Sequence, residues 1–262
     1  IWGAAVLCIV FSFISPLMAF LQTIPNCVMG GVCVALYGFI AVSGLKMLQG
    51  VDLNENRNLF VASIILITGI GGQGTVLAAK LLAQAAQTRG WQVRTAETIG
   101  MAQRGGSVVS HVRMDNGGEE VAAPLLNSAT ADMIIAFEPG EAARCLPYLA
   151  SGGTLVTAKS AVQPITAALS GSGYSSAGAI EGLHAALDGT DAKLCVVDDA
   201  ALVAASGLRK ARNVMLLACA LSTGAVPITV DDLRDAIRVC VKPSFVDMNL
   251  AAVDAALEAL QG

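Results

Sequence analysis

The first 45 residues of this chain carry no charged side chain, because the first charge is that of Lys46. A stretch so apolar does not fit the surface of an ordinary soluble domain. A membrane-crossing helix needs roughly 20 apolar residues, so the segment has room for two hydrophobic, transmembrane-type helices. We place them at residues 1 to about 22 and about 28 to 48. The sequence lacks an initial Met and the basic start of a signal peptide, so we expect a piece of a longer reading frame.

From Val51 onward the composition becomes that of a normal globular protein. The net charge of the chain is −4, and no basic stripe with interleaved aromatic residues occurs, so we expect no nucleic-acid partner. The seven cysteines form no C-x-x-C pair, whereas iron–sulfur and zinc sites need clustered thiolates. We therefore predict no metal site and interpret the cysteines as buried thiols in a reducing compartment.

The segment "IILITGIGGQGTVLAAK" at residues 64–80 joins a short apolar run to a glycine turn and an Ala/Leu-rich stretch. The apolar run is too short to cross a membrane, and it fits a buried parallel strand. Residues 74–89 then show helical apolar spacing and end before Gly90. The sequence therefore predicts strand, turn and helix in this order.

Further elements alternate along the chain. We predict strands at 91–97, 131–138, 153–158 and 193–198, and helices at 139–149, 199–205, 212–221, 231–239 and 250–260. The turn Asp115–Asn116–Gly117–Gly118 predicts a hairpin within residues 107–124, and residues 170–178 read as a flexible surface loop. The predicted fold class is α/β, with a largely parallel, Rossmann-like sheet, helices on both faces and an inserted hairpin, preceded by two hydrophobic helices.

The glycines of the turn, Gly69, Gly71 and Gly74, have the G-x-G-x-x-G spacing of a dinucleotide-binding turn. Free N–H groups at the start of the following helix favour phosphate or carboxylate. Glu97 lies 23 residues beyond Gly74, near the position of a ribose-binding acid, which gives the interpretation of a free-standing NAD(P)-binding oxidoreductase. The competing interpretation is a structural turn that packs helix on sheet, and Gln73 inside the turn departs from the usual fingerprint.

A second polar segment, "AETIGMAQRGGSVVSHVR" at residues 96–113, concentrates charged and hydrogen-bonding groups in a glycine-rich span. Arg104 is either a bidentate clamp for an anion or a solvated surface charge. His111, between valines on a strand, is more often a hydrogen-bonded structural residue than a catalyst. No Ser-His-Asp arrangement, H-E-x-x-H motif or P-loop lysine occurs, so we predict no catalytic residue in this chain.

Several long strings resemble the 2-oxoacid:ferredoxin oxidoreductases. "GIGGQGTVLAAKLLAQAA", "RTAETIGMAQRGGSVVSHVR" and "VKPSFVDMNLAAVDAAL" are similar in order to the gamma-type domain, the small subunit of indolepyruvate:ferredoxin oxidoreductase. The resemblance implies a large alpha-type partner that carries thiamine diphosphate and [4Fe–4S] clusters, coenzyme A as co-substrate, ferredoxin as an indirect partner, and no cofactor on this chain. The implied binding or subunit-interface residues are Gly71, Gly72, Gln73, Gly74, Glu97, Gln103, Arg104 and Ser107.

The first 68 residues resemble a late fragment of a uracil/xanthine-type nucleobase permease. We therefore divide the chain into a permease-like fragment at 1–58 and a gamma-type domain at 59–262. The two resemblances overlap at "IILITGIGG", as a junction between two unrelated reading frames would leave them. We expect no transport, because no acidic residue precedes Asp52. The resemblance implies a cytoplasmic domain, attached to a membrane through residues 1–48 if the head inserts.

Overall fold

The computed structural model describes residues 25–48, 63–99, 106–115, 121, 123–162 and 174–261. The chain divides into two compact units, Ile1–Glu55 and Asn56–Gly262.

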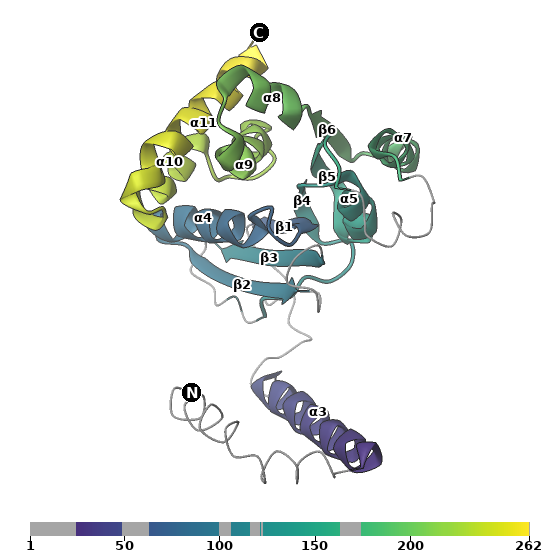
Figure 1. Ribbon diagram of the computed structural model, residues 1–262. Helices are drawn as coiled ribbons and strands as arrows, with labels where there is room; N and C mark the ends of the chain where they lie inside the picture. Colours follow the sequence, from purple (N-terminus) through teal and green to yellow (C-terminus); the bar gives the residue numbers. More distant parts are fainter. Residues whose placement is uncertain are drawn as a thin grey trace. The chain divides into compact units, whose positions relative to one another are not determined.

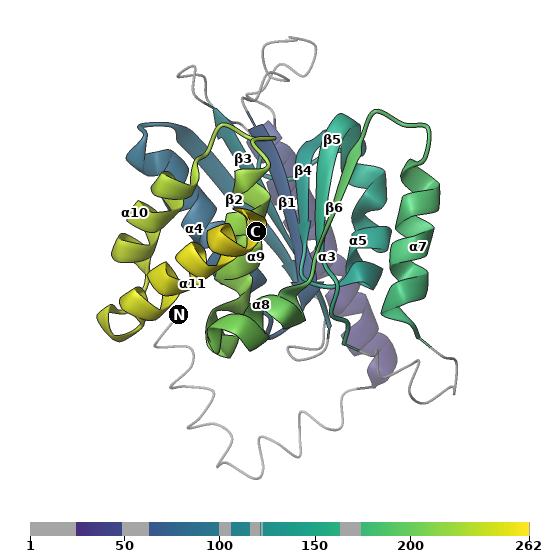
Figure 2. The same ribbon diagram turned by 90° about the horizontal axis from the view of Figure 1, so that it is seen from above.

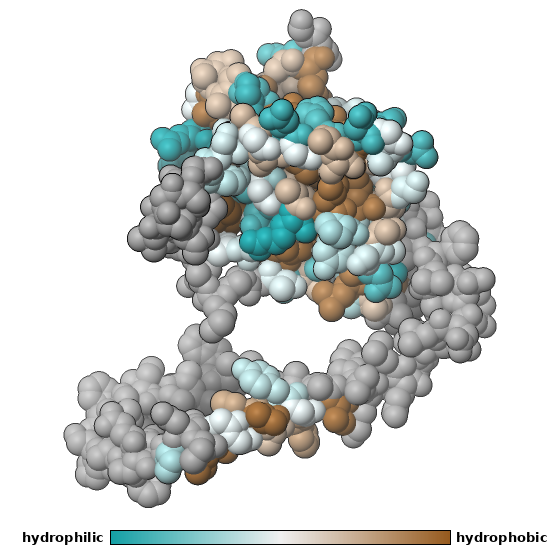
Figure 3. Space-filling model, turned by 90° about the vertical axis from the view of Figure 1, so that its right-hand side faces the viewer, coloured by the Kyte–Doolittle hydropathy of each residue, from teal (hydrophilic) through white to brown (hydrophobic). Residues whose placement is uncertain are grey.

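The first unit contains one described helix, α3 (Asn26–Leu48), which covers the second predicted hydrophobic helix. Apolar side chains lie on its surface in Figure 3, and those of Val34, Tyr37 and Phe39 are more than 70% exposed. In the part of the chain that the structure describes, no helix has the length and apolarity that a membrane crossing requires. The prediction of a transmembrane-type helix at 28–48 is therefore not supported, and the one at 1–22 lies outside the described residues.

The second unit is an α/β domain built on one six-stranded sheet (Figure 1). The strand order is β2-β3-β1-β4-β5-β6. β1, β4, β5 and β6 are parallel neighbours, while β3 runs antiparallel to both β1 and β2. The sheet is therefore mixed, with β3 as its one reversed strand. The strands are β1 (Ser63–Ile70), β2 (Gln92–Ile99), β3 (Ser107–Asp115), β4 (Ala131–Ala136), β5 (Leu149–Ala158) and β6 (Lys193–Val197).

Helices cover both faces of this sheet, as predicted (Figure 2). On one face α4, α9, α10 and α11 bury Ile65 and Ile67 of β1, and on the other α5 and α7 bury Leu66. Alternate residues of a strand point to opposite faces, so a sheet covered on both faces requires a strand like β1, which is buried along its whole length and apolar apart from Ser63 and Thr68. The helices are α4 (Thr75–Thr88), α5 (Pro139–Cys145), α7 (Ser176–Leu187), α8 (Asp199–Ser206), α9 (Arg212–Ser222), α10 (Val230–Cys240) and α11 (Pro243–Gln261), with 3-10 turns η2 (Leu146–Tyr148) and η3 (Arg209–Ala211).

The predicted hairpin around residues 115–118 is wrong about the strand that pairs with β3. β3 does form at Ser107–Asp115, but it pairs with β2 on one side and β1 on the other. Both of its backbone edges are thus occupied, so a third strand has nothing to pair with. Residue 121 and residues 123–130 form no strand. The N–H of Leu126 instead donates to Nδ1 of His111, 3.3 Å away.

One helix begins earlier than predicted, and another, α7, forms where no helix was predicted. α11 starts at Pro243 rather than near residue 250, because proline is well tolerated in the first turn, where its missing N–H breaks no helical bond. α7 starts at Ser176, inside the segment predicted as a loop. The Ser175 side chain accepts a hydrogen bond from the N–H of Gly178 and caps this helix, which accounts for the serine-rich sequence.

Candidate anion-binding pocket at the carboxyl edge of the sheet

The glycine turn joins β1 to α4 at the carboxyl edge of the parallel strands. Gly72 and Gly74 have φ values of 104° and 87°, which side-chain-bearing residues rarely adopt. Gly74 is the N-cap residue of α4, and no side chain caps this helix. The first N–H groups of α4 therefore remain available to an anion. The N–H of Gly71 is used differently, because it donates to the carbonyl of Gly106 at 2.8 Å.

Gln73 explains why this turn departs from the dinucleotide fingerprint. Its Oε1 accepts a hydrogen bond from the N–H of Ile70 at 2.7 Å, and its Nε2 donates to the carbonyl of Phe137 at 3.4 Å. A Cβ on Gly69 would lie 2.7 Å from that Oε1. The side chain thus ties the turn to the end of β4, and Gly69 is needed to make room for it.

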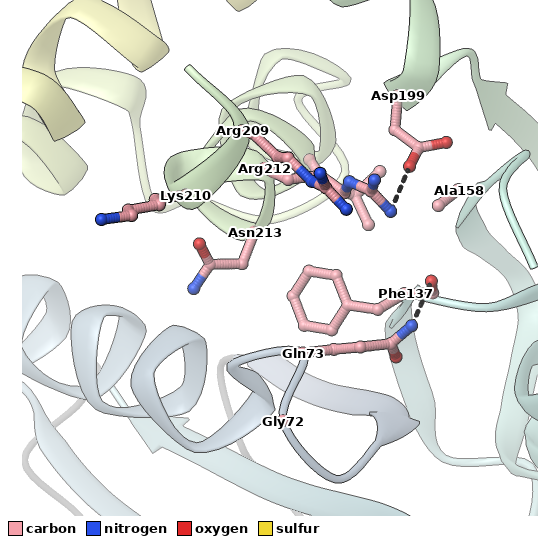
Figure 4. A pocket seen from close by; sticks show the side chains of 10 residues that line it. Gly72, Gln73, Phe137, Ala158, Asp199, Arg209, Lys210, Arg212 and Asn213 are labelled. Atoms are coloured by element: carbon pink, nitrogen blue, oxygen red, sulfur yellow. Dashed lines mark hydrogen bonds and ion pairs between the residues drawn. The ribbon is translucent and has the colours of Figure 1, made fainter. Parts of the chain in front are cut away.

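A cavity of about 310 Å³ opens beside this turn (Figure 4). Its walls come from the β1–α4 turn, the ends of β4 and β5, and the starts of α8 and α9. In an open α/β sheet, ligands bind in the crevice outside the carboxyl ends of the strands, and this cavity has that position. The lining residues are Gly72, Gln73, Phe137, Ala158, Asp199, Arg209, Lys210, Arg212, Asn213 and Leu216.

Three cations in a run of four residues, Arg209, Lys210 and Arg212, give this cavity its charge. Arg212 Nη1 lies 3.3 Å from Oδ2 of the buried Asp199, an ion pair drawn in Figure 4. The other carboxylate oxygen of Asp199 accepts from the N–H of Ser160 at 2.9 Å. Among the described residues no carboxylate pairs with Arg209 or Lys210. The cavity therefore keeps an excess of positive charge beside the unoccupied N–H groups of α4, and it suits a phosphate or carboxylate.

Asn213 closes the cavity against the glycine turn. A Cβ on Gly74 would lie 2.5 Å from Nδ2 of Asn213, so the first turn of α9 and the first turn of α4 meet here without space for a side chain. Gly74 thus serves two needs at once, a left-handed backbone and close packing of two helix starts.

A second polar cluster lies at the same edge of the sheet, where α5 begins. Glu138 and Glu141 are both buried. Glu141 Oε2 accepts hydrogen bonds from Ser107 Oγ at 2.5 Å and from Thr68 Oγ1 at 3.4 Å. Glu138 Oε2 accepts from the N–H of Glu141 at 2.9 Å and caps α5, and its Oε1 accepts from the Tyr174 hydroxyl.

In the described part of the chain, one ion pair reaches this second cluster. Arg144 reaches Glu141 Oε1 with Nη2 at 3.2 Å from a mostly exposed position. Burial of Tyr174 and its bond to Glu138 raise the pKa of that phenol well above its ordinary value. We name these residues, Thr68, Ser107, Glu138, Glu141 and Tyr174, the α5 cluster. Because its carboxylates are buried and satisfied, the cluster holds four chain segments together and offers no open site.

The structure separates the predicted site residues. Gly72 and Gln73 line the cavity, and Gly71 and Gly74 form the turn beside it. Ser107 belongs to the α5 cluster. Gln103 and Arg104 lie outside the described residues.

Glu97 is exposed on β2, and β3 separates this strand from β1. In a dinucleotide-binding fold the strand that bears the ribose-binding acid is next to β1. The position of Glu97 therefore gives no support to the interpretation of a dinucleotide site.

Sequence reasoning missed the cationic wall of the cavity. Its signal was present, because Arg209, Lys210 and Arg212 stand just after Gly207 and just before an apolar helix. The sequence does not indicate that α9 begins beside the glycine turn, which lies more than 130 residues earlier in the chain. That proximity arises from the packing of α9 on the sheet.

The remaining candidate groups are structural. His111 is buried, accepts a hydrogen bond from the N–H of Leu126 and meets the Tyr148 ring edge-on at 6.2 Å, and burial lowers its pKa. Burial also raises the pKa of the Cys219 thiol to about 11. Within the described ranges no three His, Cys, Asp or Glu side chains gather as metal ligands would.

Comparison with known proteins gives a consistent family for residues 64–259, which match the family described as pyruvate ferredoxin/flavodoxin oxidoreductase. The indolepyruvate oxidoreductase subunit IorB of Pyrococcus horikoshii is 34% identical over 195 residues, which is 74% of this chain and 94% of that protein. The corresponding subunit of Thermococcus kodakarensis is 32% identical, with the same coverage of both chains.

Solved structures share the fold. The pyruvate oxidoreductase subunit PORC of Thermotoga maritima has a TM-score of 0.54 at 20% identity, covering 76% of this chain and 97% of its own. The 2-oxoglutarate:ferredoxin oxidoreductase of Magnetococcus marinus, solved with coenzyme A bound, has a TM-score of 0.56 at 15% identity, covering 77% of this chain and 31% of its own.

Residues 1–76 match a different family, described as the permease family. The uracil permease of Bacillus caldolyticus is 51% identical over 72 residues, which is 27% of this chain. The chain spans only 17% of the length of that permease.

Proposed function

Because this chain belongs over residues 64–259 to the pyruvate ferredoxin/flavodoxin oxidoreductase family, we propose that it is the accessory small subunit of an indolepyruvate-type 2-oxoacid:ferredoxin oxidoreductase. Its similarity to two archaeal IorB subunits over nearly their whole length supports the aryl-2-oxoacid as substrate class. The complex would decarboxylate the 2-oxoacid oxidatively in the cytoplasm, with coenzyme A, and would yield an acyl-CoA, CO₂ and reduced ferredoxin.

The chemical steps belong to the large alpha-type subunit in this proposal. Thiamine diphosphate and [4Fe–4S] clusters need metal ligands and clustered thiolates, and the described part of this chain offers no such group. The residues that it does offer are suited to binding and orientation. The small subunit would therefore hold a co-substrate and complete the site.

The positive cavity at the carboxyl edge is the observation that carries this role. Coenzyme A is a polyanion, and Arg209, Lys210 and Arg212 line one wall of a cavity beside the free N–H groups of α4. Asp199 is buried and paired with Arg212, so it would hold that guanidinium in place for a phosphate. Gly72 lets the backbone approach the ligand, as its lining position requires.

The experiment that tests the proposal uses the full chain, co-expressed with a cluster-bearing large subunit of an indolepyruvate oxidoreductase. The readout is coenzyme A-dependent reduction of a viologen dye by indolepyruvate. We expect activity only with both chains, and a KM for coenzyme A raised about tenfold in Arg209→Gln, since a charge-assisted hydrogen bond contributes about 1.5–3 kcal/mol.

Arg238→Gln is the matched control, because Arg238 is an exposed arginine of α10 whose partner is Asp235 on the same helix. Its KM for coenzyme A should equal that of the unmodified complex. Full activity of the large subunit alone would contradict the proposed function. An equal KM in both arginine variants would contradict the role of the cavity.

For the head of the chain we propose a separate origin. Residues 1–58 would be a permease-like fragment and 59–262 the gamma-type domain, as the two family matches support. The fragment spans too little of a permease to form a transport path, so cells expressing the chain should take up uracil no faster than control cells. Uptake above the control would contradict this assignment.

A further inference from the structure

An apolar groove of about 320 Å³ adjoins the cationic cavity, and nothing in the proposed function uses it. Lys210 and Asn213 line both spaces, so the groove and the cavity share one wall. The groove lies between the starts of α4, α9 and α11 and the end of α10. We call it the α11 groove; its lining residues are Leu77, Lys210, Asn213, Cys240, Val241, Lys242, Phe245, Met248 and Asn249.

Phe245 presents a large apolar side chain at this groove from a rigid position. Its ring belongs to the first turn of the 19-residue helix α11, yet the residue is 43% exposed. The N–H of Phe245 donates to the carbonyl of Lys242 at 2.9 Å, and its carbonyl accepts from Nδ2 of the buried Asn249 at 2.7 Å. The backbone is thus fixed, so a partner would meet a pre-organised aromatic anchor with little ordering cost.

Two further exposed apolar side chains stand next to groove residues in the sequence. Val76 and Val239 are 42% and 66% exposed and directly precede the groove residues Leu77 and Cys240. Met248 adds a flexible, polarizable wall that adapts to different shapes. An apolar surface with an aromatic centre and a polar rim is typical of a protein–protein contact.

The rim of the groove is basic although the chain as a whole is acidic. Lys210 and Lys242 are exposed at the groove, and its lining contains no Asp or Glu, whereas the chain has a net charge of −4. A complementary partner therefore carries carboxylates next to an apolar or aromatic side chain. A second copy of this chain fits poorly, because a two-fold contact would place the same lysines against each other.

We propose that the α11 groove is the docking site for the large subunit, which inserts a segment with an apolar or aromatic side chain flanked by carboxylates. The inference rests on the proposed function, since it requires that a large subunit exists. Docking here would bring the cofactor-bearing subunit against the wall that the groove shares with the cationic cavity. Co-substrate binding and subunit association would then use adjacent faces of Lys210 and Asn213.

The test measures the dissociation constant between the full chain and the purified large subunit, by biolayer interferometry at low and high salt. Phe245→Ser should weaken binding about 30-fold or more, as loss of a central aromatic anchor does. Lys242→Glu should weaken it about tenfold at low salt and less at high salt, because salt screens the exposed charge.

Two control variants change an apolar residue and a lysine outside the groove. Leu125→Ser alters an apolar side chain that is 57% exposed and outside the groove, and Lys193→Glu alters an exposed lysine on β6. Both should keep the affinity within about threefold, the scatter expected of surface substitutions. Thermal unfolding of every variant confirms folding, which is expected because Phe245 lies partly exposed.

Equal affinities in the groove variants and the control variants would overturn the docking proposal while leaving the proposed function intact. Loss of a homodimer in Phe245→Ser, with unchanged affinity for the large subunit, would assign the groove to a second copy and also overturn it. If the unmodified chain binds no large subunit and forms no active complex, the proposed function itself fails. The viologen assay therefore separates the two failures.

Discussion

Two polar regions at the same edge of the sheet differ in whether their charged side chains have partners within the protein. In the α5 cluster, buried Glu138 and Glu141 are satisfied by hydroxyl groups and a backbone N–H. In the cavity beside the glycine turn, Arg209 and Lys210 are exposed and unpaired within the described residues. Buried charge without a partner is costly, so satisfied carboxylates indicate a structural role. Exposed cations that line a cavity indicate ligand binding, because their negatively charged partner is then another molecule.

The comparison predicts that the largest loss of stability follows from Glu141→Ala. This change removes the acceptor shared by Ser107 and Thr68 and leaves the buried Thr68 hydroxyl and the partly buried Ser107 hydroxyl without it. We expect the free energy of unfolding to fall by about 2–3 kcal/mol, measured by urea denaturation. Arg144→Gln is the control, since its exposed ion pair with Glu141 should contribute less than about 1 kcal/mol. A smaller effect of Glu141→Ala than of Arg144→Gln would break the comparison.

Gly74→Ala should give the next largest effect. The new Cβ would meet Nδ2 of Asn213 at 2.5 Å, and the φ of 87° is unfavourable for alanine. We expect a loss of about 1–2 kcal/mol in the free energy of unfolding, with a raised KM for coenzyme A because the turn shifts. Gly90→Ala, which meets nothing within 4 Å at a φ of 78°, isolates the backbone strain alone. Equal losses in both variants would show that Asn213 makes no difference.

Tyr174→Phe should cost about 1 kcal/mol of unfolding free energy, because Glu138 loses one hydrogen-bond donor and the N–H of Gly140 loses an acceptor. The pKa of Tyr174 is raised in the folded state. Its contribution is therefore fully present below about pH 10, the ordinary tyrosine value, and is lost as the pH rises toward the folded-state pKa.

Urea denaturation between pH 8 and pH 11 checks this sign. The unmodified chain should lose stability above pH 10 more steeply than Tyr174→Phe. Tyr148→Phe, which removes a phenol hydroxyl outside the α5 cluster, serves as the control. Identical slopes for Tyr174→Phe and the unmodified chain would remove Tyr174 from the α5 cluster.

The smallest effect on stability is expected for Arg209→Gln. The side chain is exposed and no described carboxylate pairs with it, so thermal unfolding should change by less than about 0.5 kcal/mol. The same variant is the one expected to raise the KM for coenzyme A. A substitution that lowers binding and leaves stability unchanged would sharpen the contrast with Glu141→Ala, and a large loss of stability would erase it.

The sequence predicted most elements of the second unit because their signals are local. The apolar run of β1, the glycine turn and the helical spacing of α4 were each identified close to their observed bounds. The membrane prediction rested on the same kind of local signal, the absence of charge, and it is not supported for the described helix α3.

Strand order and the choice of pairing partner depend on residues far apart in the sequence, so local patterns did not predict them. The hairpin signal at residues 115–118 was strong, but β3 gained antiparallel partners on both sides, and the place for a further strand disappeared. β3 also lies between β2 and β1, so Glu97 on β2 is separated from the glycine turn at the end of β1. A pattern of residues cannot report which of several compatible strands will pair, because pairing depends on long-range contacts.

By itself the sequence determined that residues 63–74 form a strand and a turn, since a largely apolar run, typical of a strand covered on both faces, leads into closely spaced glycines. These glycines allow the left-handed backbone that Gly72 and Gly74 adopt. It also determined that thiolates are too scattered for a cluster. The tertiary structure alone decided that Arg209, Lys210 and Arg212 face that turn. The physical reason is that α9 is buried on all sides from Val214 to Leu221, between the sheet and α11, and this packing places the charges at its start at the carboxyl edge.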